Sequence, residues 1–214
     1  MNTSNLLQKI ARKGSDPAKI AAQVIKSPEL IAGVMEGLGA NKPVLKYRCE
    51  KILRSVGERK PELLYPQFNF FTTMLDCNNS ILKWGAIISI ANLARADGEN
   101  KFESIFDRYF APITGPVMIT AANTIGSSAR IALAKPHLAD RISKAILKVE
   151  GAEYKTPECR NVAIGHAIDS LDQFFDHVQD KDCIIRFVKK QLMNTRTPVR
   201  KRAERFLKKR NILS

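Results

Sequence analysis

The stretch Leu82-Lys-Trp-Gly-Ala86-Ile-Ile-Ser-Ile90-Ala-Asn-Leu93 has a frame that occurs five times in the chain, at intervals of 35 to 42 residues. Each copy has an apolar residue or Cys, then a small residue or Cys four positions later, then an apolar residue or Ala four positions after that. Spacing of four and eight residues places all three side chains on one stripe of an α-helix. The copies therefore predict five helices that share one equivalent inward position, occupied by Cys49, Ala86, Ala121, Ala163 and Ala203.

Proline divides the rest of the chain into short segments. Eight prolines follow capping or turn residues, and proline suits the first turn of a helix because its missing N–H would be unpaired there anyway. The resulting segments of about 10–20 residues are typical of stacked helical hairpins. We expect an N-terminal pair of helices at 4–13 and 17–26, and the first helices of the five pairs at 28–39, 62–77, 101–112, 136–150 and 180–194. The eight prolines are Pro17, Pro28, Pro43, Pro61, Pro116, Pro136, Pro157 and Pro198.

The recurring frame resembles the second helix of a HEAT repeat, whose pattern is a capped turn followed by Val-Arg-x-x-Ala-x-x-x-Leu. The copy at 197–207 matches this pattern best, whereas the third copy departs from it with Met118 where a basic residue is expected. The resemblance covers residues 28–210 and implies an all-α fold, a right-handed α-α superhelix of about five helix pairs. Residues 1–27 are then capping helices, continuous with a repeat domain at 28–214. An irregular helical bundle that imitates the period is the alternative.

The middle copy, at 81–94, is apolar on nearly every face. A helix that is apolar all round is buried all round, so we expect this helix to have neighbours on both sides. Trp84 is accordingly predicted to pack in the core.

Charge is the strongest compositional signal. The 214 residues include 35 Lys and Arg against 21 Asp and Glu, for a net charge of +14. The excess lies at the two ends, with +7 in residues 1–60, +1 in 61–150 and +6 in 151–214. Such a distribution favours attraction to phosphate or to acidic protein surfaces.

Two groups of cations are candidate binding residues. Lys46, Lys83, Arg160 and Arg200 occupy the same position in four copies of the frame, and equivalent positions in a solenoid form a row along one face. In HEAT proteins this residue often pairs with an acidic side chain of the adjacent turn, but the turns here carry neutral Asn or Thr. The second group belongs to the last helix, where cations far outnumber the single Glu204: Lys201, Arg202, Arg205, Lys208 and Lys209.

Catalytic signatures are scarce. The sequence has no phosphate-binding loop with Gly-Lys-Ser/Thr, and no GxSxG or HExxH motif. His166, Asp169, Gln173 and Asp176 share one helical face that could in principle bind a metal, although a polar face of an amphipathic helix is the commoner explanation. We therefore expect no enzymatic activity, cofactor, metal or small-molecule substrate.

One family of enzymes shares the expected fold and charge. HEAT-like-repeat alkylpurine DNA glycosylases are basic, of similar length, and line a concave DNA-binding groove with Trp, Asp and Arg. The resemblance is limited to fold and charge, because the single Trp is assigned to the core and no matching Asp is identified.

These observations predict a non-enzymatic scaffold that binds an acidic protein or peptide through the second-helix face and the basic last helix. A nucleic-acid backbone binder is the alternative. No apolar run is long enough for a membrane span, residues 1–5 lack the features of a secretory signal, and the four cysteines form no CxxC pair. We therefore expect a cytoplasmic protein.

Overall fold

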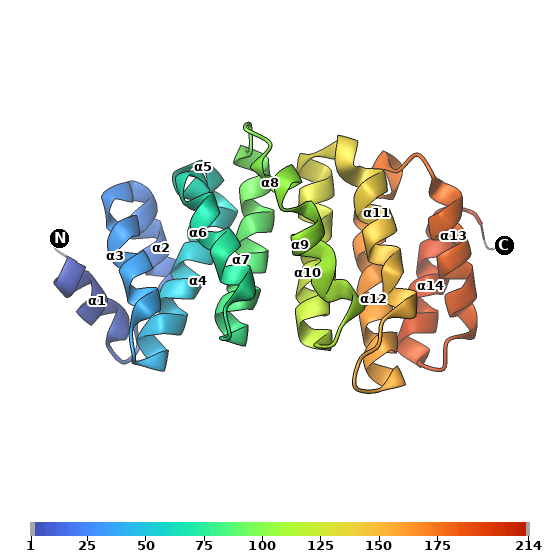
Figure 1. Cartoon of the computed structure of the whole chain (residues 1–214), viewed down its shortest axis with the longest axis horizontal. Helices are drawn as coiled ribbons and strands as arrows, with labels where there is room; N and C mark the ends of the chain where they lie inside the picture. The colour runs from blue at the N-terminus through green and yellow to red at the C-terminus, as the bar shows by residue number, and fades with distance from the viewer. Residues whose placement is uncertain (1–2, 213–214) are drawn as a thin grey trace. The chain divides into compact units, whose positions relative to one another are not determined.

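The computed structural model describes residues 3–212, and every regular element in this range is a helix. The chain forms two compact units, which meet in the sequence between Ser104 and Ile105. Helix pairs stack side by side within each unit, so the fold is an all-α solenoid of helical repeats, as the sequence predicts (Figure 1). The units are described separately below. The predicted boundary between residues 27 and 28 stays a prediction.

In the first unit, α2, α4 and α7 are the second helices of successive pairs, and each packs against the next: α2 on α4, and α4 on α7. Helix α1 packs on α3. Helix α3 is the first helix of its pair, and the first helices of successive pairs together form the first-helix layer. The elements are α1 (Thr3–Ala11), α2 (Pro17–Lys26), η1 (Pro28–Leu30), α3 (Ile31–Glu36), η2 (Gly37–Gly39), α4 (Pro43–Arg59), α5 (Pro61–Leu64), η3 (Tyr65–Gln67), α6 (Phe68–Thr73), η4 (Met74–Asp76), α7 (Ser80–Leu93), η5 (Ala94–Ala96) and α8 (Lys101–Ser104).

In the second unit, α10, α12 and α14 are the second helices; α10 packs on α12 and α12 on α14. Helices α11 and α13 contact each other in the first-helix layer and lie against α12 and α14 respectively (Figure 1). The elements are α9 (Phe106–Phe110), η6 (Ala111–Thr114), α10 (Met118–Ala134), η7 (Pro136–Leu138), α11 (Ala139–Leu147), η8 (Lys148–Gly151), α12 (Pro157–Phe174), η9 (Phe175–His177), α13 (Lys181–Lys190), η10 (Gln191–Met193) and α14 (Thr197–Lys209).

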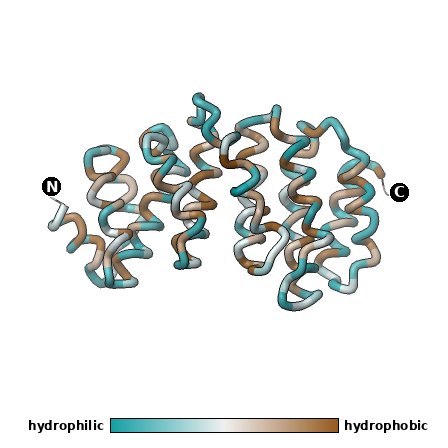
Figure 2. Tube along the Cα trace, in the orientation of Figure 1, coloured by the Kyte–Doolittle hydropathy of each residue, from teal (hydrophilic) through white to brown (hydrophobic). Residues whose placement is uncertain are grey.

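The middle position of the recurring frame is confirmed as an inward position of the second helices, whereas the first position is 49% exposed at Val117, which precedes α10. The five small residues of the frame fall one each on α4, α7, α10, α12 and α14, and none is more than 1% exposed. Apolar residues recur along every helix of both units (Figure 2). The small side chains let neighbouring helices approach closely: a Cβ on Gly85 of α7 would come within 2.5 Å of the Glu50 carboxyl group on α4.

The proline-based helix starts are confirmed at seven of the eight positions. Each of these prolines lies at the first or second position of a helix. The exception is Pro116, which follows Gly115 in a cis peptide bond. Helix α10 begins only at Met118, with Val117 in the N-cap position.

The predicted first helices are present but are interrupted by 3-10 turns. Pro66 and Pro112 lie inside two of them, and a proline removes a backbone donor and clashes with the preceding turn. The chain accordingly changes to 3-10 geometry at η3 and η6. First helices are therefore assemblies of short pieces, whereas α4, α10 and α12 run unbroken for 17 or 18 residues.

Hydrogen bonds between neighbouring pairs repeat at the length of one repeat. Arg48 donates to the carbonyl of Ile10, 38 residues earlier, and Arg95 donates to the carbonyl of Glu58, 37 residues earlier. In the second unit Arg210 donates to the carbonyl of Asp172, again 38 residues earlier. In each case the arginine donates to a carbonyl in the last turn of a helix of the preceding pair, where carbonyls lack an intrahelical partner.

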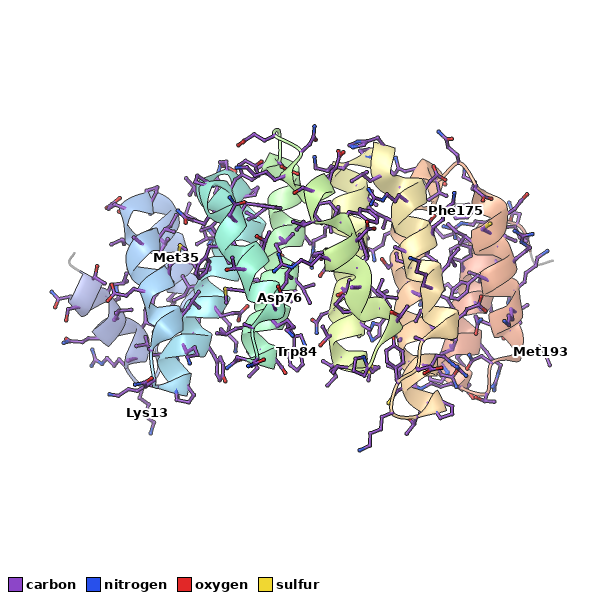
Figure 3. The ribbon with its side chains drawn as sticks, viewed as in Figure 1. Lys13, Met35, Asp76, Trp84, Phe175 and Met193 are labelled. Carbon is purple, nitrogen blue, oxygen red and sulfur yellow. The ribbon has the colours of Figure 1, made fainter. Side chains whose placement is uncertain are left out.

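Helix α7 is mostly buried, and it packs on α4, α5 and α6 within its unit. The prediction for Trp84 was wrong, because its side chain is only half-buried. Trp84 lies near the start of α7 (Figure 3), on one stripe with Ile81, which is 40% exposed, and half-buried Ile88. The helix therefore has one partly open face, which an all-apolar sequence does not reveal.

Candidate binding surface

Helix α14 is held by an apolar stripe that leaves its cations at the surface. Val199, Ala203, Phe206 and Leu207 are buried, as their spacing predicts. This burial fixes the helix against α12 and α13. The basic side chains consequently project from the remaining surface of α14, toward α12 or toward solvent.

Most of these cations bind carboxylates of α12. Arg202 Nε lies 2.9 Å from Asp169 Oδ2, and Arg205 Nη2 lies 3.0 Å from Asp169 Oδ1. Lys209 Nζ lies 3.2 Å from Asp172 Oδ1. Three of the five candidate cations of the last helix therefore make ion pairs within the unit, although Arg205 and Lys209 remain more than half exposed. The partners are 33, 36 and 37 residues apart, close to the length of one repeat, so these pairs are visible in the sequence only after the repeat length is known.

Arg210 is a structural residue that the sequence analysis did not single out. Its side chain is 11% exposed, and its Nη2 lies 2.6 Å from Asp172 Oδ1. The guanidinium also lies over the rings of Phe206 and Phe175, at 3.7 and 4.2 Å from their centroids. Phe175 is marked in Figure 3. Arg210 thus joins the end of α14 to α12 and η9.

Arg200, one of the four row residues, secures its own turn. Its guanidinium donates to the carbonyls of Asn194 and Thr195, at 2.7 and 3.1 Å, and to Thr197 Oγ1 at 2.9 Å. Arg200 thus bonds to backbone and hydroxyl oxygens around the start of α14. In the HEAT pattern, the equivalent arginine would instead pair with an acidic side chain of the adjacent turn.

The other three row residues are available for a partner. Lys46, Lys83 and Arg160 are half-buried, and their side chains form no hydrogen bond or ion pair with any residue in the range 3–212. Because α4 packs on α7, Lys46 and Lys83 occupy equivalent places on adjacent helices. On α14, Lys201 and Lys208 are exposed and equally lack a bonding partner among the described residues.

His166 and Asp169 of α12 lie beside Arg202 of α14. Burial, followed by the nearby Arg202 charge, lowers the pKa of His166. The two carboxylate oxygens of Asp169 pair with Arg202 and Arg205, and the Gln173 side chain donates to the Asp169 backbone carbonyl. Across residues 3–212, no three His, Cys, Asp or Glu side chains are grouped so as to hold a metal ion.

A glycine makes room for one of the ion pairs. A Cβ on Gly165 of α12 would overlap Nη1 of Arg202. The absence of a side chain at residue 165 therefore lets the guanidinium lie against α12 and reach Asp169.

In the part of the chain that the structure describes, no helix combines the length and the hydropathy required to cross a bilayer.

No family model matches the sequence, and no curated protein matches it. Solved structures do match its fold. A designed armadillo repeat protein in complex with the peptide (KR)4 is 13% identical, with 95% of this chain and 90% of that chain covered and a TM-score of 0.57. The crystal structure of an engineered protein is 14% identical, with 97% and 96% covered and a TM-score of 0.56. In its fold, the chain resembles the armadillo and HEAT-like helical-repeat solenoids.

Proposed function

We propose that the protein is a non-enzymatic scaffold that binds an acidic protein or peptide through its second-helix face and basic last helix. The observation that carries this proposal is a set of five surface cations without bonding partners among residues 3–212. Such charges are well solvated in the free protein, and they can form ion pairs when a partner supplies carboxylates. They are Lys46, Lys83, Arg160, Lys201 and Lys208.

The structural neighbours support a scaffold in a general sense. One of them is a designed repeat protein in complex with (KR)4, a peptide of Lys and Arg. The second-helix face and α14 of the present chain carry the five cations named above, so this surface would repel a peptide of that kind. Charge complementarity instead favours a partner rich in Asp and Glu.

The arrangement of charges favours a protein over a nucleic-acid backbone. Asp169 and Asp172 lie among the cations of α12 and α14. A phosphate backbone is negative along its whole length and would meet these carboxylates as well as the cations. A protein partner can place its acidic residues against Lys201 and Lys208 and avoid the carboxylates. A cytoplasmic location remains a prediction from the sequence.

The test is a binding titration with a fluorescent (Asp-Glu)4 peptide. Changing Lys201 and Lys208 to Glu leaves the bonded cations intact, so the fold should be retained. Two reversed surface charges are worth about 1.4 kcal/mol together, or a tenfold loss of affinity. The matched control reverses two exposed cations on the first-helix layer of the same unit, Lys148 and Lys189, and should change affinity less than twofold.

Equal affinities for the two double variants would contradict the proposal. Duplex DNA supplies the second arm of the experiment. Tighter binding to DNA than to the acidic peptide, with a slope near −0.9 log unit per log unit of salt for each phosphate contacted, would favour the nucleic-acid alternative.

A further inference from the structure

The first-helix layer of the first unit has a charge opposite to that of the chain. Residues 27–41 and 61–82 contain no Lys or Arg, although 15 of the 35 basic residues lie within residues 1–104. The same two segments carry four acidic residues: Glu29, Glu36, Glu62 and Asp76. This layer is therefore negative, while the second helices of the same unit carry the positive charge.

An open apolar groove lies within this negative layer, between η1 and α3 on one side and α5 and η3 on the other. Its volume is about 460 Å³. Ile31, Ala32 and Met35 form one wall, and Leu63 and Pro66 form the other. Ala32 and Pro66 are exposed and too small to fill the space, and Met35 is half-buried. Met35 is marked on α3 in Figure 3.

One carboxylate lines this groove, and two more belong to the same negative layer. Glu29 is itself a lining residue, and Glu36 and Glu62 are the exposed neighbours in sequence of two others, Met35 and Leu63. Lys60 Nζ lies 3.7 Å from Glu62 Oε1, but both side chains are more than half exposed. An ion pair of that kind is weak, so the Glu62 carboxylate remains available to a partner.

We propose that this groove binds a basic amphipathic helix of a partner protein. Apolar residues at i and i+4 of such a helix enter the groove, and its Lys and Arg residues are attracted by Glu29 in the groove and by the negative charge of the surrounding layer. Helices commonly bind in apolar grooves in this way, and the volume lies within the usual range of about 300–1,000 Å³ for binding clefts. The partner has the opposite charge to the acidic one proposed above, so the two surfaces serve different ligands.

The chain's own basic helix does not fit this role. The apolar side chains of α14, including Val199 and Phe206, are buried within the second unit. The same is true of Phe187 on α13, which is also basic. The folded α13 or α14 of a second copy would therefore present cations to the groove without the apolar residues needed to fill it.

The test uses three labelled model helices of equal length: one with Leu at i and i+4 on a Lys-rich background, one with the same Leu residues on a Glu-rich background, and one Lys-rich helix with Ala in place of Leu. The Lys and Leu peptide should bind at least tenfold more tightly than either of the others. Ala32→Arg places a cation in the groove and should weaken its binding at least tenfold. Ala18→Arg, the same change at an exposed position on α2, should alter it less than twofold.

A second pair of variants tests the rim. Changing Glu29 and Glu36 to Lys should weaken binding of the basic peptide by about tenfold, whereas changing Glu153 and Asp182 to Lys, which are exposed in the other unit and lie outside α14, gives the same net charge and should leave it unchanged. Circular dichroism and thermal melting confirm that each variant is folded. None of these variants should affect binding of (Asp-Glu)4, so this proposal and the proposed function can fail independently.

Three outcomes would overturn the inference. The basic peptide does not bind, or the Glu-rich peptide binds as tightly, or Ala32→Arg has no more effect than Ala18→Arg. Sedimentation provides the last check, because a dimer of the unmodified chain that Ala32→Arg dissociates would identify the occupant as a second copy and overturn the assignment to a partner helix.

Discussion

Arg210→Ala is expected to destabilise the second unit by about 3 kcal/mol. The substitution removes a nearly buried partner of Asp172, and breaking a buried pair costs about 3–5 kcal/mol. Lys209 remains 3.2 Å from Asp172 and compensates in part. Loss of the contacts with Phe175 and Phe206 adds about 0.5–1 kcal/mol each, for a combined range of about 4–7 kcal/mol. The expected loss is lower than this range because Lys209 still pairs with Asp172 and because Asp172 is 27% exposed.

The measurement is urea unfolding followed by circular dichroism, with free energies from linear extrapolation. Lys208→Ala removes an exposed cation from the same turn and should change stability by no more than about 0.5 kcal/mol. Arg210→Lys keeps the charge but loses the planar group that stacks on both rings, and should recover only part of the loss. The reasoning is refuted if Arg210→Ala and Lys208→Ala unfold at the same urea concentration.

Three further changes test the packing of the helices. Burial raises the pKa of Glu50 above its ordinary value of 4.5, so ionisation of this carboxyl group opposes folding. The protein therefore has its full stability below about pH 4.5, where Glu50 is protonated, and loses part of it as the pH rises through the folded-state pKa. Glu50→Gln should therefore be more stable than the unmodified chain at pH 7 and equal to it near pH 4, as measured by urea unfolding at each pH. Asp97→Ala should cost about 3 kcal/mol, because it leaves the Tyr65 hydroxyl and the Lys101 and Phe102 amides without their acceptor, and a thermal melt that does not shift would contradict this. Gly165→Ala should be neutral or destabilising in the unmodified chain but stabilising by about 0.5–1 kcal/mol after Arg202→Ala, since alanine favours the helix once the guanidinium is gone. A thermodynamic cycle over the four proteins measures that change of sign, and a gain of equal size in both backgrounds would refute the steric argument.

The architecture could be predicted from the sequence because it depends on periodic features. Small residues such as Cys49 and Ala163 indicate which side of each second helix packs against its neighbours. Proline favours the first turn of a helix through the geometry of its own backbone. Neither effect requires knowledge of distant residues. The interruptions at Pro66 and Pro112 follow from the same local rule.

The bonding of the candidate cations could not be predicted in this way. Arg200 and Lys83 occupy the same place in the frame, yet Arg200 binds three oxygen atoms of its own turn and Lys83 binds none of the described residues. The difference depends on the conformation of the preceding loop. Trp84 was misplaced for a related reason: where every face of a helix is apolar, the sequence does not indicate which face lies open.

The arginine bonds between successive helix pairs have a direction. Arg95 reaches back to Glu58, Arg210 reaches back to Asp172, and each supports a helix that precedes its own. Removing the later helix therefore leaves a terminal carbonyl of the earlier helix without its donor, whereas removing the earlier helix returns the arginine to solvent. The apolar packing is lost in both cases, so these bonds are the part of the interface whose loss affects the earlier helix more than the later one.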